Sequence, residues 1–366
     1  MKDPAAAPDG SDLNSLASVR MERGIALLNA GSPEAWHEAI RCFEEVITLR
    51  QQLPLADNPE FRYGLSAGWI NRGDALARLG GGENLADAVN SYTTAIELLK
   101  EVPAGDDDGL FVRRLAIAWM NRGVALEAQE SAPALSEAIR SYEAAVALLN
   151  RSPHTGDVRH KLVLASAWTN LGNAQLHSAG SELAATTCAA AETALSLLAE
   201  TEAHDLAAAE TGLKARHVLC QAIAAVLAAP AHDTTQEMDL IGKMTDAVED
   251  ALGLVQSWER AGVARFRPLA THLFHLGALV YEKHQPQFLA EFLLEHLDPK
   301  RAGGLPPEAA NWLAIADASL ARASRGIAGR DFEWLATPQG RRGLETLKEL
   351  QAAQVRLRAV RGAGPA

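Results

Sequence analysis

The sequence predicts an all-α protein built from antiparallel helix pairs, and three observations lead to this prediction. Apolar residues make up 48% of the chain but aromatic residues only 5%. Much of the apolar fraction is Ala and Leu, which favours helix over strand. A pair of short motifs recurs about every 50 residues. No segment shows the sustained alternation of apolar and polar residues that is typical of a half-buried strand.

The first recurring motif places a glycine four residues after a tryptophan. Its clearest copies read WINRGDAL from Trp69, WMNRGVAL from Trp119 and WTNLGNAQ from Trp168, and a fainter copy surrounds Gly24. The glycines are spaced by 49, 50 and 49 residues, at Gly24, Gly73, Gly123 and Gly172. Self-similarity at a fixed period of this size indicates a repeat architecture.

The second motif begins 15 residues after each glycine and reads Ala-x3-aromatic-x2-Ala in its clearest copies. The aromatic residues of the first three copies are Phe43, Tyr92 and Tyr142, and the fourth copy has Ala191 at this place. A proline follows each of these three aromatic residues 11 positions later. Proline there can stop a helix and start an extended link.

Trp-x2-Leu-Gly, then Ala-x3-aromatic-x2-Ala, then Pro resembles the signature of the tetratricopeptide repeat (TPR) family. The resemblance covers roughly residues 14–200, and Trp168 to Asn173 match its first half best. It implies a right-handed superhelical solenoid of antiparallel helix pairs. A standard unit has about 34 residues, so these longer units imply longer helices. The structural residues of the repeat are then Trp69, Gly73, Tyr92, Trp119, Gly123, Tyr142, Trp168 and Gly172.

Close approach of the two helices of a pair requires small residues such as Gly and Ala, and we expect the aromatic residues to fill the gaps between successive pairs. Apolar spacing and turn residues predict the helix limits. The first helices of the pairs are expected near 14–29, 59–79, 109–129 and 157–178. The second helices are expected near 33–51, 84–101, 134–150 and 182–200.

Beyond about residue 203 the repeat fades while helical patterning continues. The expected helices there are 213–227, 238–259, 263–283, 287–297, 307–324 and 343–360. We therefore predict a disordered N-terminus over 1–12, four TPR-like repeats over 13–202 and degenerate helical repeats over 203–366. A separate helical C-terminal domain is the alternative for this last part.

The charge of the chain argues against a general nucleic-acid-binding protein. The formal net charge is −12, whereas binding to phosphates requires a clustered cationic surface. From Arg322 to the end there are nine Arg and Lys residues against four Asp and Glu residues. We expect this basic stretch to be a solvated face or an intramolecular partner of the acidic body.

The cysteines and the apolar segments bear on localisation. The three cysteines, Cys42, Cys188 and Cys220, are far apart and odd in number, which favours a reducing cytoplasm over a disulfide framework. No stretch of 18 apolar residues occurs, and the first residues contain no apolar segment typical of a signal peptide. We therefore expect a cytoplasmic protein without membrane insertion.

Three asparagines are the leading candidates for a binding site. Asn71, Asn121 and Asn170 each follow the repeat tryptophan by two positions, which on a helix turns them about 200° away from the packed seam. The TPR resemblance implies that they form a column on the concave face. An asparagine side chain both donates and accepts, so it can pair with the N–H and C=O groups of an extended peptide. The alternative is that each satisfies a neighbouring backbone group.

Further candidates lie on the same helix faces or one to two turns away. The residues that share the asparagine face are Asp74, Arg78, Asn173 and His177. Arg114 and Arg159 lie one or two turns earlier on similar helix faces. They are candidates for contact with an acidic group. We expect Arg72 and Arg122 instead to pair with an acidic residue of an adjacent helix.

Sequence patterns for catalysis or cofactors are missing. His272 and His275 share a helix face, with Glu282 and His284 nearby, but they follow no recognised metal-ligand pattern. Phosphate-binding loops, nucleophile elbows and HExxH motifs do not occur. We therefore expect no enzyme activity, cofactor or metal. The predicted function is a scaffold or adaptor for an unknown protein or extended peptide. The alternative is a regulatory sensor that binds a small ligand or signalling peptide.

Overall fold

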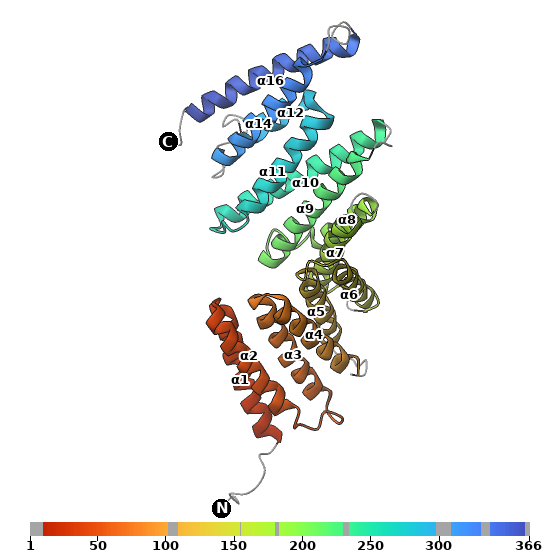
Figure 1. Cartoon of the computed structure of the whole chain (residues 1–366), viewed down its shortest axis with the longest axis vertical. Helices are drawn as coiled ribbons and strands as arrows, with labels where there is room; N and C mark the ends of the chain where they lie inside the picture. The colour runs from red at the N-terminus through yellow and green to blue at the C-terminus, as the bar shows by residue number, and fades with distance from the viewer. Residues whose placement is uncertain are drawn as a thin grey trace, which may run out of the picture. The chain divides into compact units, whose positions relative to one another are not determined.

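The computed structural model describes residues 10–101, 109–153, 155–179, 183–229, 234–297, 309–330 and 337–362. In these ranges the chain folds into fourteen α-helices without any strand, as Figure 1 shows. The prediction of an all-α fold is therefore confirmed. Most of the N-terminal segment predicted to be disordered lies outside the described residues.

Packing divides the chain into two compact units. The first unit is Met1–Ala179 with Ser196–Leu198, and the second is Gly180–Leu195 with Ala199–Ala366. This division concerns packing and does not test where the repeats end, so the predicted domain limits stay a prediction.

In the first unit each helix packs on the next along the chain, which is the arrangement of an α-solenoid. Its helices are α1 (Gly10–Ala30), α2 (Pro33–Arg50), α3 (Pro59–Leu79), α4 (Gly82–Lys100), α5 (Leu110–Glu127), α6 (Ala132–Asn150) and α7 (Val158–Ala179). The predicted limits agree with these to within four residues. The predicted helix 59–79 matches α3 at both ends.

Local sequence explains where these helices begin and end. Ser32 and Ser131 accept hydrogen bonds from backbone N–H groups at the starts of α2 and α6, and Asn58 does so at the start of α3. Each of these helices also has a proline in its first turn, where the missing N–H has no helical partner. Helix α3 ends at Gly80 with φ of 66°, a conformation that favours glycine.

The spacing of 19 residues between each repeat glycine and its aromatic residue has a steric cause. A Cβ atom on Gly73 would lie 2.7 Å from the ring of Tyr92, and one on Gly123 would lie 2.5 Å from Tyr142. The ring of Phe43 lies equally close to Gly24. The aromatic ring therefore packs against the glycine of its own pair, whereas we had expected it to fill the gap between pairs.

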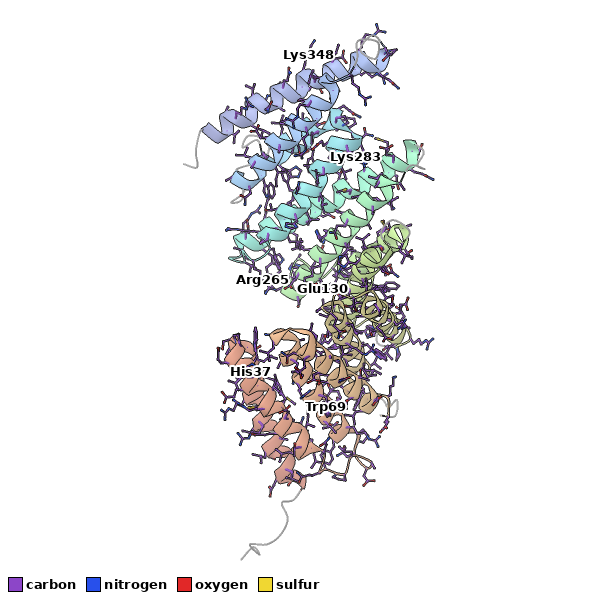
Figure 2. The ribbon with its side chains drawn as sticks, in the orientation of Figure 1. His37, Trp69, Glu130, Arg265, Lys283 and Lys348 are labelled. Atoms are coloured by element: carbon purple, nitrogen blue, oxygen red, sulfur yellow. The ribbon has the colours of Figure 1, made fainter. Side chains whose placement is uncertain are left out.

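The tryptophans take part in the contacts between pairs. Trp119 packs against two apolar clusters, one that includes Tyr92 and one that includes Tyr142. Trp69 packs on the cluster around Tyr92, and Figure 2 shows its place in the first unit.

The second unit contains α9 (Leu206–Ala228), α10 (Thr234–Arg260), α11 (Arg267–His284), α12 (Pro286–Leu297), α14 (Ala309–Ala328) and α16 (Pro338–Gly362). It also contains α8 (Ala184–Leu198) as far as Leu195. Phe274 lies at the centre of its core, stacked on Trp312 at 4.5 Å and on Phe292 at 5.6 Å between ring centroids. A Cβ atom on Gly277 would lie 2.7 Å from Phe292. The glycine–aromatic contact therefore recurs here at a spacing of 15 residues.

Among the helices in the described ranges, none combines the length and apolar character needed to cross a membrane.

Candidate functional site

Two of the three candidate asparagines link successive helix pairs. Asn71 Nδ2 lies 3.1 Å from Met21 Sδ, and Asn121 Nδ2 donates to Asp74 Oδ1 at 2.9 Å. Both bonds reach back to the first helix of the preceding pair, and the partner is a side chain rather than a backbone group. Asn170 is half-buried, and its side chain makes no hydrogen bond within the described residues.

Asp74 is the centre of a half-buried polar network. It accepts hydrogen bonds from Tyr92 OH at 2.7 Å and from Asn121. Burial raises the pKa of the Asp74 carboxyl, although both hydrogen bonds oppose this shift. Asp74 therefore joins α3, α4 and α5. In the next pair Glu127 accepts the hydrogen bond from Tyr142 OH. Sequence analysis missed Glu127 because Val124 occupies the position equivalent to Asp74.

Arg72 and Arg122 tie the two helices of their pairs together. Arg72 Nη1 donates to Ser91 Oγ at 2.8 Å, and Arg122 Nη1 donates to Ser141 Oγ at 2.6 Å. Arg122 also pairs with Glu137 at 3.0 Å. The structure thus shows the expected pairing of these arginines with acidic residues, since Arg72 likewise lies 3.1 Å from a carboxylate oxygen of α2.

The other predicted residues are spread along the first helices. Exposed Arg78 donates to the Leu28 carbonyl at 3.2 Å. Exposed His177 lies 3.9 Å from a carboxylate oxygen of Glu127. Asn173 is half-buried and Arg159 is exposed. None of these four residues lines either of the two cavities described below.

Asn71 and Arg114, by contrast, line the same cavity. It has a volume of about 390 Å³ and lies among α1, α3 and α5, with Arg50 at the end of α2 also in its wall. Phe61 and Tyr63 from the first turns of α3 provide aromatic surface. The cavity therefore combines two amides, two guanidinium groups, the carboxylate of Glu60 and apolar surface on the side of the unit formed by the first helices.

The guanidinium of Arg114 stacks on an aromatic ring. Its carbon lies 3.5 Å from the centroid of the Tyr63 ring, and its Nη1 donates to the Tyr63 carbonyl at 3.1 Å. Tyr63 itself packs against Phe111 at 4.8 Å between ring centroids. Burial lowers the pKa of the Arg114 guanidinium, and the nearby charge of Arg50 lowers it further.

Arg50 is a residue of this cavity that sequence analysis missed. Its side chain is buried, and Nη1 donates to the Gly64 carbonyl at 2.5 Å. A Cβ atom at Gly64 would lie 3.2 Å from the guanidinium carbon, so the glycine permits this close approach. The repeat could have pointed to Arg50, because it is a charged residue at a position where the other copies have leucine. The equivalent residues 49, 99 and 148 positions later are Leu99, Leu149 and Leu198.

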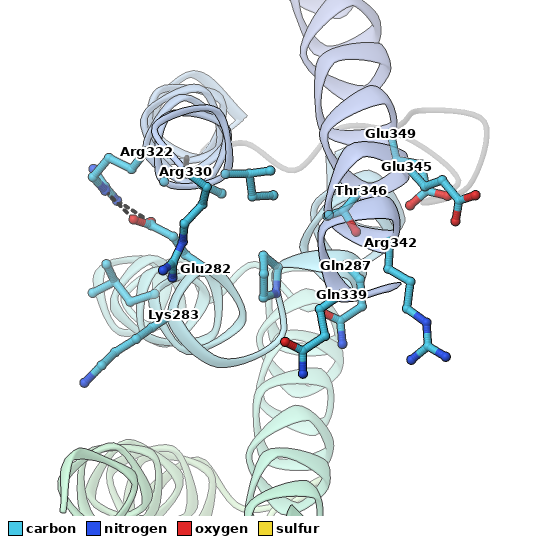
Figure 3. Close-up of a pocket in the computed structure, with 16 residues that line it drawn as sticks. Glu282, Lys283, Gln287, Arg322, Arg330, Gln339, Arg342, Glu345, Thr346 and Glu349 are labelled. Carbon is cyan, nitrogen blue, oxygen red and sulfur yellow. Dashed lines mark hydrogen bonds and ion pairs between the residues drawn. The ribbon is translucent and has the colours of Figure 1, made fainter. Parts of the chain in front are cut away.

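The second unit has a larger cavity of about 910 Å³ among α11, α12, α14 and α16. Arg322 donates to both carboxylate oxygens of Glu282 at 2.8 Å, and Figure 3 shows this pair across the cavity from Gln339 and Arg342. The wall is rich in charged and amide side chains.

No group of three or more His, Cys, Asp or Glu residues suited to a metal ion occurs in the described ranges.

The stacked helix pairs and their repeated glycine–aromatic contacts define a helical repeat protein. No protein-family model and no curated protein matches the sequence. A similar solved structure is a circular tandem repeat protein with novel repeat topology and enhanced subunit contact surfaces. It has a TM-score of 0.33 and 16% identity, over 97% of this chain and 87% of that chain. The assignment to the helical repeat class rests on the helices themselves.

Proposed function

We propose that the chain is a TPR-like, non-catalytic scaffold or adaptor, and that the first helices of its first unit bind an extended segment of a partner protein. The observation that carries this proposal is the cavity of about 390 Å³ that Asn71 and Arg114 share. Both residues were selected from the sequence because of their place in the repeat.

The chemistry of this face suits a peptide. Asn71 and Asn121 each use one donor in the structure, so a second N–H remains for a peptide carbonyl. Ile25 on α1 and Val124 on α5 are exposed apolar side chains of first helices, 40% and 48% accessible. Net hydrogen bonds contribute about 1 kcal/mol each, and micromolar binding needs about 8 kcal/mol. Apolar contacts and charge pairs must therefore supply the remainder.

The cysteines support a cytoplasmic location. Cys42 and Cys220 are buried, and the three thiols are free in the structure. Burial raises the pKa of Cys220 to about 12 and that of Cys188 to about 11. These thiols stay protonated at neutral pH, which suits packing in a reduced protein.

Partner capture tests the proposal. The full chain and the triple variant N71A/N121A/N170A would be used to isolate binding proteins from native cytosol for mass spectrometry. The control variant N29A/N90A/N150A removes three exposed asparagines. We expect the control to keep the partner and the first variant to lose it with its helicity retained. Equal capture by both variants would contradict the proposal.

The cavity of the second unit supports a second candidate function, that of a regulatory sensor for a small ligand. The opposed Glu282–Arg322 pair and Arg342 offer both charges to a polar ligand. A metabolite that binds there would raise the melting temperature of the wild-type chain but not of the variant R342A. If no compound in a metabolite screen changes the melting temperature, this second function fails.

A further inference from the structure

The structure separates the residues that the sequence groups around His272. Glu282 pairs with an arginine of α14 at 2.8 Å, and His284 lies 3.0 Å from a carboxylate oxygen of α10. His275 is exposed on α11. His272 lies next to the imidazole of His217 on α9, with 6.1 Å between the two ring centroids. The fold therefore brings together two histidines that are 55 residues apart in the sequence.

The packing of α9 on α11 holds this pair in place. His217 is half-buried, and its neighbour Val218 belongs to the core of the second unit. His272 is exposed, and its neighbour Leu273 is fully buried in the same core. The core thus fixes the backbone under both rings, while the exposed ring of His272 leaves the pair open to ions from solution.

The two rings are placed so that both can coordinate one metal ion. A metal ion lies about 2.0–2.1 Å from an imidazole nitrogen, and hence about 3.2 Å from the ring centroid. The centroids of two rings on one ion are then at most about 6.4 Å apart, and about 5.2 Å apart at a tetrahedral angle. The observed 6.1 Å lies within this limit, and rotation of the exposed His272 side chain shortens it.

The inclination of the rings also suits a shared ion. The planes of His217 and His272 are tilted by 56°. The lone pair of an imidazole nitrogen lies in the plane of its ring, so the lone pairs of two tilted rings can point at one position between them. Parallel stacked rings do not allow this.

His217 is in the protonation state that binds metal ions. Burial lowers the pKa of its imidazole below the ordinary value of 6.5, and the neighbouring charge of His272 lowers it further. His217 is therefore neutral at neutral pH. Since a metal ligand must be deprotonated, a neutral imidazole binds an ion without first losing a proton.

We propose that His217 and His272 bind one divalent transition-metal ion of the kind that prefers imidazole ligands, such as Zn²⁺, Cu²⁺ or Ni²⁺. Ca²⁺ and Mg²⁺ are excluded as ligands of this pair because they prefer oxygen. The site lies in the second unit, whereas the proposed peptide-binding face lies in the first. The two proposals are therefore independent.

The number of protein ligands defines the kind of site. In the described ranges no third His, Cys, Asp or Glu joins the pair, so water completes the coordination of the ion. Structural zinc sites typically have four protein ligands and catalytic sites three. A site with two histidines holds its ion less tightly, and the ion can exchange with solution. When bound, it links α9 to α11 and stabilises the second unit.

Calorimetric titration of the metal-free, full-length chain with Zn²⁺ at pH 7 tests the site. The variants are H217A and H272A, and the matched control is H275A, which removes another exposed histidine of α11. Because His272 is exposed, H272A is expected to fold like the wild type, and circular dichroism checks this for each variant. Thermal unfolding with and without Zn²⁺ gives a second measurement.

We expect the wild type and H275A to bind one Zn²⁺ per chain, and the affinity of H217A and H272A to be at least about tenfold weaker. Zn²⁺ should raise the melting temperature of the wild type and H275A alone. Absence of saturable Zn²⁺ binding by the wild type would overturn the proposal, and so would an unchanged affinity in folded H272A. Binding that is lost in H275A and kept in H217A would place the ion on α11 alone and contradict the site between two helices.

Discussion

The side-chain amide of Asn121 donates a hydrogen bond to Asp74 Oδ1 across 2.9 Å, and this bond joins the first helices of two successive pairs. Tyr92 donates to the same carboxylate oxygen. The amide oxygen of an asparagine at position 74 could accept both of these hydrogen bonds. Asp74 is nevertheless half-buried, and the partial burial of its carboxylate raises its pKa.

This relationship predicts that D74N is tolerated or stabilising whereas D74A is not. Asn keeps the acceptor oxygen and removes a buried charge, so we expect a gain of about 1 kcal/mol in the free energy of unfolding at pH 7. Ala leaves buried Tyr92 and half-buried Asn121 without their acceptor, and we expect a loss of about 2 kcal/mol. Urea unfolding followed by circular dichroism measures both. A greater loss for D74N than for D74A would contradict the account.

The raised pKa of the Asp74 carboxyl predicts that the stability of the folded chain depends on pH. Its folded pKa is raised above the ordinary value of 3.8, so the folded state binds a proton more tightly than the unfolded state. The contribution of Asp74 to stability therefore falls as the pH rises from near 3.8 through the raised folded pKa. Subtracting the pH profile of D74N from that of the wild type should show this fall, and a difference that rises with pH in this window would be inconsistent with it.

The glycine–aromatic contact predicts a clear difference between two substitutions to alanine. G73A places a Cβ atom 2.7 Å from the Tyr92 ring, and we expect a destabilisation of about 1–3 kcal/mol. Gly242 lies within α10 with open space around its Cβ position, and G242A should stabilise by about 0.5–1 kcal/mol because alanine favours helix. Thermal unfolding would show whether the two changes have opposite signs.

The buried guanidinium of Arg50 predicts that a leucine at this position is more stable. R50L restores the leucine of the other pairs and removes an unpaired buried charge, so the free energy of unfolding should rise by about 1 kcal/mol. Urea unfolding measures the change, and an R50L variant that is less stable than the wild type would show that Arg50 stabilises this core.

Burial predicts that the cysteines react slowly. Since the pKa of Cys220 is raised to about 12, its thiolate is scarce at pH 8. We expect iodoacetamide to leave Cys220 unmodified in the folded chain and to modify it after denaturation, as measured by peptide mass spectrometry. Equally fast modification before and after denaturation would show that Cys220 is accessible.

The sequence was sufficient to predict the fold of the first unit because its constraints are local. Gly73 and Tyr92 must meet at a fixed spacing, and capping residues such as Ser32 and Asn58 mark the helix starts. In the second unit the spacing from Gly277 to Phe292 is shorter, so the period no longer predicts which helices pair.

The candidate site was predicted only in part. Asn71 and Arg114 followed from the repeat, but Arg50 belongs to a second helix and enters the cavity only because Gly64 lets it approach. Glu127 takes over the role of Asp74 from one turn further along its helix. The roles of Arg50 and Glu127 depend on which side chains of different helices meet in space. The spacing of residues along the sequence does not specify these contacts.

Site-specific photo-crosslinking tests whether the first helices bind the partner. A photoreactive amino acid at Ile25 or Val124, both exposed on first helices, would be compared with one at Glu97 or Glu143, both exposed on second helices. The account predicts that both first-helix positions crosslink to the same partner from native cytosol and that the second-helix positions do not. Crosslinks of equal yield from the second helices, or none from the first, would contradict it.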